Sequence, residues 1–423
     1  MDQGLAAAAA RMNVDCPTRS GARLATGVLA ALGLLAGVSD AGAQVPRRIR
    51  WAALGNSITQ GSGYPDKLQA LLGPAFLVEN EGVSATTMLK KSNYSYWTNG
   101  RFAQTFAFKP DIVSVKLGTN DSKPANWPAG RSAFLADTRA MVDTLRGMPS
   151  KPLAFLCYPV PVFQKNGAWA VDGINDPVIK NEIMPFIKQV AEEKQTGLID
   201  LHTFLENRGD LFAGDGVHPD AGKAGGDSIA MGIFRAFKAQ AIRVACIGNS
   251  ITDNGHNAQA YPVRLNMRLG RDHFVLNAGH SGYTLLRKGD LPYYKSPWFA
   301  EVFKFQPQVI TIKLGTNDTK AYNWDAHKDE FVSDLRWMVD TLMTMAGKPR
   351  IYLCTPIPVW KNSDGSDPFG IRGEVILNEV IPKIKQVAEE KGLKVLDLHT
   401  PFLPYQRLTS DGVHPNAEGL DTL

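Results

Sequence analysis

Three residue types that together perform nucleophilic catalysis occur in the first half of the sequence. Ser57 stands in a Gly-Asn-Ser turn directly after an apolar, strand-like run, whereas Asp215 and His218 share the segment Asp-Gly-Val-His-Pro. A serine hydroxyl is a weak nucleophile until a base accepts its proton. An aspartate three residues before the histidine can bind the other ring nitrogen and orient the ring, as in a Ser-His-Asp triad. The spacing therefore predicts acyl transfer, with Ser57 as nucleophile, His218 as base and Asp215 as orienting acid.

Acyl transfer also requires hydrogen-bond donors for the oxyanion of the tetrahedral intermediate, and removing one donor costs about 3 kcal/mol of transition-state stabilisation. Gly82 follows a second apolar run and offers a backbone N–H. Asn120, in Gly-Thr-Asn-Asp, offers a side-chain amide. Together with the N–H of Ser57, these groups are expected to form a three-donor oxyanion hole.

The whole catalytic set occurs twice, in the same order. The hexapeptide around Asn120 recurs around Asn317 (317 − 120 = 197), and the block around Ser57 recurs around Ser250 (250 − 57 = 193). The second copies of the remaining positions are Gly279, Asp411 and His414. A repeat of this length is long enough for each copy to hold a core of its own. The sequence therefore predicts two complete catalytic domains in tandem.

Length and composition agree with two ordinary globular domains, which we place at residues 46–240 and 241–423. A chain of 423 residues exceeds the usual size of a single core, and 44% of the residues are apolar. The formal charge of +5 is spread without a Lys/Arg cluster, so no nucleic-acid partner is expected. Cys157, Cys246 and Cys354 show no CxxC spacing, so neither a disulfide framework nor a zinc site is indicated. Cys157 and Cys354 sit in apolar runs and are interpreted as buried small hydrophobes. No cluster has metal-ligand spacing, so neither a metal nor another cofactor is expected.

The N-terminus has the pattern of a secretory signal. Arg19 and Arg23 precede an apolar run over 24–38, and the small residues Ala-Gly-Ala follow at 41–43. The run is shorter than the ~20 residues that a membrane span needs. We therefore predict a signal peptide over residues 1–43, a secreted or periplasmic protein and no membrane span.

The elements that position the catalytic residues alternate between short apolar runs and helical patterns, which is typical of parallel βαβ construction. The runs predicted as strands in the first domain are 49–54, 76–78, 112–117, 153–158 and 198–201. The predicted helices are 132–146, 178–194 and a last one from Pro219 towards Ala239. Each domain is thus predicted to be a three-layer α/β/α sandwich on a five-stranded parallel sheet. Ligands bind at the carboxyl ends of the strands of such sheets, where the repeated motifs fall.

Four blocks resemble those of the SGNH (GDSL-like) hydrolases: Gly-Asn-Ser-Ile-Thr, Asn-x-Gly, Gly-Thr-Asn-Asp and Asp-x-x-His-Pro. The resemblance extends over essentially the whole of both domains. It implies a flavodoxin-like sheet and metal-free ester hydrolysis through an acyl-serine, with the Ser, Gly, Asn and His positions given above as catalytic residues. The first block reads Gly-Asn-Ser-Ile instead of the commoner Gly-Asp-Ser-Leu, as in secreted carbohydrate-directed branches. No Gly-x-Ser-x-Gly elbow occurs, which argues against the α/β-hydrolase fold.

Other titratable residues repeat near the same strand ends. His202 and His399 are interpreted as structural because no second titratable cluster accompanies them. Asp200 and Asp397 are weaker candidates for the triad acid because they lie well before the histidine loop. The aspartates that follow the oxyanion asparagines are expected to anchor their loops by hydrogen bonds; they are Asp121 and Asp318.

The substrate is less well defined by the sequence. Trp127 and Trp324 occupy matching positions after the asparagine blocks and are predicted to bind substrate by stacking on sugar rings, with packing as the alternative. No apolar lid of a lipase is evident. We therefore predict an esterase that removes acetyl or other small acyl groups from a small-molecule or carbohydrate ester. A lipolytic or lysophospholipase-type esterase is the alternative enzyme. An inactive carbohydrate-binding protein is the alternative of another class, which the intact catalytic set disfavours.

The two domains differ at their ends. The first has 240 − 219 = 21 residues after Pro219, whereas the second has 423 − 415 = 8 residues after Pro415 and lacks most of its last helix. We therefore expect the second domain to be less stable and its histidine loop to be poorly anchored. Contact with the first domain or with another chain would relieve both effects.

Overall fold

A computed structural model describes residues 46–169, 173–220 and 222–423, so the predicted signal peptide lies outside the described residues. Within them, the chain divides into two compact units, Arg48–Gln240 and Ala241–Leu423. No helix among these residues is long and apolar enough to cross a membrane. Cys157, Cys246 and Cys354 are free and buried, which confirms the burial predicted for Cys157 and Cys354.

Unit 1 is built on a parallel sheet of five strands in the order β2-β1-β3-β4-β5. The strands are β1 (Ile49–Gly55), β2 (Phe76–Gly82), β3 (Ile112–Lys116), β4 (Leu153–Cys157) and β5 (Gly197–Ile199). The helices are α3 (Ser57–Gly61), α4 (Tyr64–Leu72), α5 (Gly100–Phe108), α6 (Trp127–Arg146), α7 (Asp176–Val178), α8 (Met184–Glu193), α9 (Leu201–Leu205) and α10 (Gly225–Gln240). The predicted strands and the two clearest helices are thus confirmed to within a few residues.

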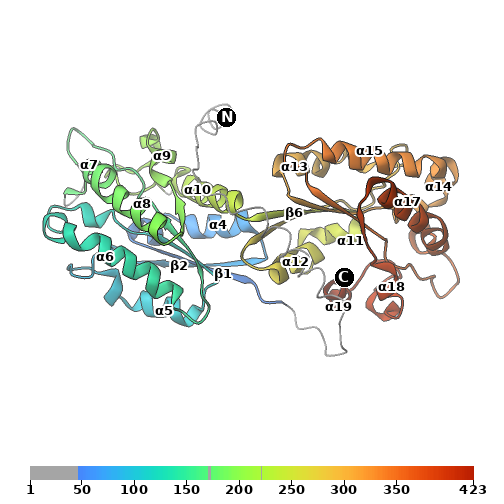
Figure 1. Cartoon of the computed structure of the whole chain (residues 1–423), viewed down its shortest axis with the longest axis horizontal. Coiled ribbons are helices and arrows are strands. Elements are labelled where there is room, and N and C mark those ends of the chain that lie inside the picture. The colour runs from blue at the N-terminus through green and yellow to red at the C-terminus, as the bar shows by residue number, and fades with distance from the viewer. Residues whose placement is uncertain (1–45, 170–172, 221) are drawn as a thin grey trace. The chain divides into compact units, whose positions relative to one another are not determined.

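Unit 2 repeats this topology, with the strand order β7-β6-β8-β9-β10. Its strands are β6 (Ile242–Gly248), β7 (His273–Gly279), β8 (Val309–Lys313), β9 (Arg350–Cys354) and β10 (Lys394–Leu396). Its helices are α11 (Ser250–Asp253), α12 (Tyr261–Leu269), α13 (Pro297–Phe305), α14 (Ala321–His327), α15 (Phe331–Met343), α16 (Gly373–Val375), α17 (Ile381–Lys391), α18 (His399–Phe402) and α19 (Ala417–Thr422). In each unit, helices cover both faces of the sheet (Figure 1), which confirms the predicted α/β/α sandwich.

The direction of chain growth along the sheet reverses beside the first strand of each unit. From β1 the chain goes to β2 on one side and then to β3 on the other, and Gly55 is in register with both Gly82 and Lys116. The strand ends around such a switch point form the crevice in which open α/β sheets bind ligands. The segments after β1 and β3 carry Ser57 and Asn120, so the fold brings these two predicted residues to that crevice.

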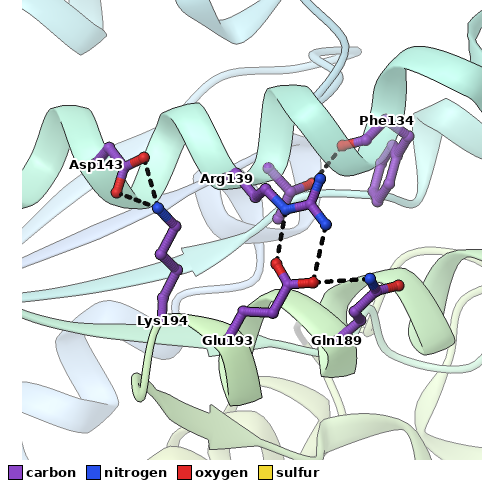
Figure 2. A network of polar contacts seen from close by, with 7 residues as sticks. Phe134, Arg139, Asp143, Gln189, Glu193 and Lys194 are labelled. Atoms are coloured by element: carbon purple, nitrogen blue, oxygen red, sulfur yellow. Dashed lines mark hydrogen bonds and ion pairs between the residues drawn. The ribbon is translucent and has the colours of Figure 1, made fainter.

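The helices on one face of the sheet are linked by ion pairs that also repeat. Figure 2 shows Arg139 of α6 in a two-pronged pair with Glu193 of α8, with N–O distances of 2.6 and 2.8 Å, and Lys194 bound to Asp143 at 2.7 Å. The same contacts join α15 and α17 through Arg336–Glu390 and Lys391–Asp340. These side chains are solvent-exposed, where ion pairs contribute little to stability. They show how closely the second unit repeats the first, down to its surface.

The opposite face of the sheet differs between the units. In unit 1, Phe237 of α10 packs edge-on against Trp51 of β1, with ring centroids 5.2 Å apart, and Trp51 also stacks on Phe155 at 6.0 Å. All three side chains are at most 1% exposed. In unit 2, α19 has 6 residues where α10 has 16. The cluster on this face has four buried members, and several apolar neighbours are only partly buried: Ile242, Leu265, Leu269, Val275 and Leu396.

The last helix of unit 1 begins later than predicted. Pro219 is not its first residue; it forms a β-bridge with Phe212, and α10 starts at Gly225. The backbone before the helix is occupied in hydrogen bonds across this bridge, including Ala213 N–H to the His218 carbonyl at 2.8 Å. The segment carrying His218 is therefore held by a small antiparallel bridge and not by the helix.

Candidate active sites

The turn after β1 presents the serine. Asn56 caps α3, with its side-chain oxygen accepting the N–H of Ile58 at 3.1 Å, and Ser57 is the first residue of that helix. Only glycine fits at position 55, because a Cβ there would lie 1.9 Å from the Thr59 hydroxyl oxygen. The N–H of Ser57 has no hydrogen-bond partner among the described residues and points from a helix N-terminus, which favours negative charge.

In unit 1 the three predicted triad residues meet. The Ser57 Oγ lies 2.8 Å from Nε2 of His218, and the Nδ1 of His218 lies 2.6 Å from Oδ2 of Asp215. A carboxylate can only accept, so Nδ1 carries the proton. Nε2 is then free to accept the serine proton, which is the tautomer that a general base needs.

Unit 2 has the same arrangement. Ser250 Oγ lies 2.8 Å from Nε2 of His414, and Nδ1 of His414 lies 2.7 Å from Oδ2 of Asp411.

The expectation of a poorly anchored histidine loop in unit 2 is wrong. Thr409 forms a β-bridge with Pro415 as its counterpart does in unit 1, and the His414 carbonyl accepts an N–H at 2.9 Å. This local bridge replaces the support that we had expected from a long helix.

The triad aspartates are kept ionised. Partial burial works to raise the pKa of Asp215, but the backbone N–H and imidazole of His218, together with the Val217 N–H, outweigh it and hold the pKa below its usual value. The same balance lowers the pKa of Asp411. A stable carboxylate orients the imidazole and stabilises the imidazolium that forms when the serine loses its proton.

The predicted oxyanion asparagines follow β3 and β8, the strands next to those that end at the serine turns. Asn120 is 4% exposed and donates one amide hydrogen to the Thr86 carbonyl at 3.0 Å. Asn317 donates in the same way to the Tyr283 carbonyl at 3.1 Å. An amide nitrogen carries two hydrogens, so the second hydrogen of each side chain remains for a ligand.

The predicted role of Gly82 and Gly279 is wrong. The Gly82 N–H donates to the Asn80 side chain at 3.0 Å, and the Gly279 N–H donates likewise to Asn277 at 3.0 Å. A Cβ at position 82 would lie 2.3 Å from the nitrogen of Gln60, so this glycine is needed for the close approach of β2 to the serine helix. These glycines shape the site, but their N–H groups are already occupied.

A different backbone N–H is available in each unit. Ala85 has φ +64° and Gly282 has φ +86°, and neither N–H has a partner among the described residues. Ala85 directly precedes Thr86, the residue to which Asn120 is anchored. Sequence reasoning missed this position because the first unit has alanine there; the Asn-x-Gly-x-x-Gly spacing of unit 2 was the available signal.

The predicted anchoring role of Asp121 and Asp318 is confirmed. The Asp121 carboxylate accepts the N–H groups of Met88 and Leu89, each at 3.0 Å. Burial raises its pKa to about 6, although these hydrogen bonds oppose the increase. Asp318 makes the same pair of contacts in unit 2 and has its pKa raised to about 6 for the same reason.

The other repeated histidines and aspartates bind elsewhere. His202 is buried and contacts Asp176 at 3.0 Å, and His399 contacts the Pro356 carbonyl at 3.0 Å. Asp200 caps α9 through the N–H of Thr203. The aspartate of unit 2 at this position does not contact the triad either: Asp397 accepts from Thr355 and from the N–H of His399. All four have the structural roles that the sequence favoured.

The predicted substrate-binding role of Trp127 and Trp324 is wrong. The two side chains are 4% and 1% exposed, so neither offers a face to a sugar ring. Their indole N–H groups donate to Glu182 at 2.9 Å and to Glu379 at 3.0 Å. Each tryptophan therefore joins the segment after the asparagine block to the neighbouring helical segment.

Comparison with known proteins identifies the family. The profile of the GDSL-like Lipase/Acylhydrolase family matches residues 53–222 and 246–421, one stretch in each unit. The chain belongs to this family. The SGNH resemblance and the fold expected from it are thereby confirmed.

Among the relatives of this GDSL-like chain is the acetylxylan esterase of Xylanibacter ruminicola, 41% identical over 197 residues, which cover 41% of this chain and 40% of that protein. The isoamyl acetate-hydrolyzing esterase 1 homolog of Homo sapiens is 29% identical over 205 residues, which cover 43% of this chain and 77% of that protein. The solved aryl esterase of M. smegmatis is 18% identical and covers 45% of this chain and 98% of its own, with a TM-score of 0.36. The chain thus spans less than half the length of the acetylxylan esterase.

Both GDSL-like triads are open to solvent. The side chain of His218 is 44% exposed and that of His414 is 35% exposed. No group of three or more His, Cys, Asp or Glu side chains among the described residues could hold a metal ion.

Proposed function

We propose that each unit is a serine esterase that hydrolyses its substrate through an acyl-serine. The observation that carries this proposal is the continuous series of hydrogen bonds from serine through histidine to aspartate, made twice in one chain at 2.6–2.8 Å. A binding protein would have no use for an oriented base beside a hydroxyl at a helix N-terminus. The relatives that match are esterases by name.

In the proposed reaction, His218 accepts the Ser57 proton while Oγ attacks the ester carbonyl carbon. The oxyanion receives hydrogen bonds from the Ser57 N–H, the Asn120 amide and, in our assignment, the Ala85 N–H. The histidine then gives its proton to the departing alcohol oxygen as the C–O bond breaks. Water then gives a proton to the same histidine and attacks the acyl carbon; the histidine returns the proton to Ser57 Oγ as the acyl–serine bond breaks and the acid is released.

We propose that Ser250, His414, Asn317 and Gly282 act in the same way in unit 2, each at the position of its counterpart. The bond distances within the two triads differ by no more than 0.1 Å.

The substrate that we propose is a carbohydrate carrying small acyl groups, with acetyl as the acyl group. The acetylxylan esterase relative supports the acetylated carbohydrate, and the exposed histidines support a bulky alcohol portion. The test is acetate release from acetylated xylan, measured beside the hydrolysis of long-chain p-nitrophenyl esters. Rapid hydrolysis of the long-chain esters without acetate release would favour the lipolytic alternative and contradict the proposed substrate.

We also propose that the protein is exported, on the strength of the basic and apolar pattern before residue 44. Expression of the full chain followed by cell fractionation and N-terminal sequencing tests this. Export with cleavage after Ala43 is the expected result, and an uncleaved chain in the cytosol would contradict it.

A further inference from the structure

One large apolar side chain of unit 2 lies exposed beside the proposed base. Phe369 is 61% exposed, and its ring centroid lies 5.6 Å from that of His414, with the two planes at 74°. Its backbone has φ +55°, in the left-handed region that bulky residues rarely adopt. Exposure and backbone strain both cost free energy, and strained residues of this kind concentrate at functional sites.

The loop that carries Phe369 is held at both ends. Before it, the N–H of Trp360 donates to the Gly412 carbonyl at 3.0 Å, which joins the loop to the segment of the base. After it, Arg372 donates from Nε to the Thr319 carbonyl at 2.7 Å, which joins the loop to the asparagine block. Phe369 therefore belongs to a loop that is fixed to both segments of the site, in a tight turn over Pro368–Gly370.

The reaction places the alcohol portion of the ester on this side. His414 must give its proton to the departing alcohol oxygen, so that oxygen has to come within about 3 Å of Nε2. Because the ring of Phe369 lies 5.6 Å from that of His414, a sugar ring attached to this oxygen comes close enough to contact Phe369. The C–H-rich face of a pyranose packs well against the face of an aromatic ring.

We propose that Phe369 is a stacking platform for the sugar ring on the alcohol side of the ester in unit 2. This inference rests on the proposed function. It makes Phe369 a specificity-determining residue and assigns it the role that the sequence had given to the two buried tryptophans.

The sequence of unit 1 does not repeat the aromatic residue at the matching position. By the offset of the asparagine blocks, the residue of unit 1 that corresponds to Phe369 is Asp172 (369 − 172 = 197), which lies outside the described residues. A carboxylate has no aromatic face on which a sugar could stack. The two sites are therefore expected to differ in their preference for the alcohol while they share the acyl chemistry.

The test uses the full chain with Ser57→Ala, so that only unit 2 is active. Acetylated xylo-oligosaccharides and ethyl acetate, an ester without a ring, are compared by kcat/KM. Phe369→Ala should lower the ratio of the sugar ester to ethyl acetate about fivefold, through KM, and Phe369→Trp should restore it. Leu377→Ala, which removes another exposed apolar side chain (51% exposed), is the matched control. An unchanged ratio, or an equal fall on both substrates, would overturn the proposal.

Adding Ser250→Ala to the Ser57→Ala chain separates this inference from the proposed function. Loss of the remaining activity supports the serine mechanism. If that loss occurs but Phe369→Ala leaves the ratio unchanged, only the stacking platform fails. If activity persists without either serine, the proposed function itself fails.

Discussion

The two units share a catalytic arrangement but not the packing behind it. In unit 1, Phe237 of the long last helix closes over Trp51 on one face of the sheet. In unit 2, α19 ends after 6 residues, and apolar side chains of that face stay partly exposed. The triad distances nevertheless agree within 0.1 Å. The comparison teaches that local hydrogen bonds at the strand ends set the geometry of the site, whereas the helix contributes to stability.

The largest expected effect is a difference in stability between the units. A buried large side chain contributes about 1.5–3 kcal/mol, and Ile229, Ile233 and Phe237 of α10 are fully buried, whereas the fragment 241–423 does not extend to the matching positions. Residues 46–240 expressed alone should therefore unfold with a free energy on the order of 3–5 kcal/mol above that of residues 241–423. Urea unfolding of the two fragments measures this. Equal midpoints and slopes would show that α19 and its neighbours compensate fully.

A second expected difference is in how well Gly82 and Gly282 tolerate a larger side chain. Gly82→Ala places a Cβ 2.3 Å from a backbone nitrogen, so we expect a loss of about 2–3 kcal/mol in unit 1. Gly282→Ala meets only the end of the Leu291 side chain at 3.1 Å, and unit 1 already has Ala85 at this position with φ +64°. We expect this change to cost about 1 kcal/mol. Thermal melts of both variants measure these costs; a Gly82→Ala chain as stable as the wild type would show that the approach of β2 to the serine helix does not require glycine at this position.

A smaller effect distinguishes the units by pH. Glu81 is 2% exposed, and burial raises its pKa to about 7, although Arg101 at 3.9 Å opposes this; unit 2 has Ala278 instead. Because the folded pKa lies above the usual value of 4.5, the stability that the protonated group provides is lost as the pH rises from about 4.5 through 7.

We therefore expect Glu81→Gln to stabilise unit 1 by on the order of 1 kcal/mol at pH 8 and to have little effect at pH 4.5. Melts of the full chain at both pH values measure the change, with Glu79→Gln as the control for a carboxylate on the same strand. A stabilisation independent of pH would mean that ionisation is not its cause.

The fold could be predicted from the sequence because its signals are local and repeated. Apolar runs separated by helical patterns define the strands, and the exact recurrence of Gly-Thr-Asn-Asp fixes the alignment of the units. The triad was predictable for the same reason: Asp215 and His218 are close in sequence, and Ser57 follows a recognisable strand. Each of these conclusions needs only residue type and spacing.

The errors arose where three-dimensional packing decides. Trp127 and an exposed aromatic residue look alike in sequence, but Trp127 packs against Phe134 and Phe186, and Glu182 accepts its indole N–H. Gly82 looked available as a donor until the Asn80 side chain was seen to occupy its N–H. Pro219 suits a helix start, yet it forms a β-bridge with Phe212 instead. The backbone groups of the residues on either side of Pro219 are hydrogen-bonded across this bridge. Phe369 had no sequence signal, since its significance comes from the contact with His414.

The most direct test of the account is to measure how much of the esterase activity depends on Ser57 and how much on Ser250. Ser57→Ala, Ser250→Ala and the double variant of the full chain are compared for acetate release from acetylated xylan, with far-UV circular dichroism to verify folding. We predict that each single variant keeps part of the rate, that the two remaining rates add up to about that of the wild type, and that the double variant loses at least about a thousandfold. A folded double variant with substantial activity would contradict the assignment of both sites. A single variant as inactive as the double would contradict the claim that each unit works on its own.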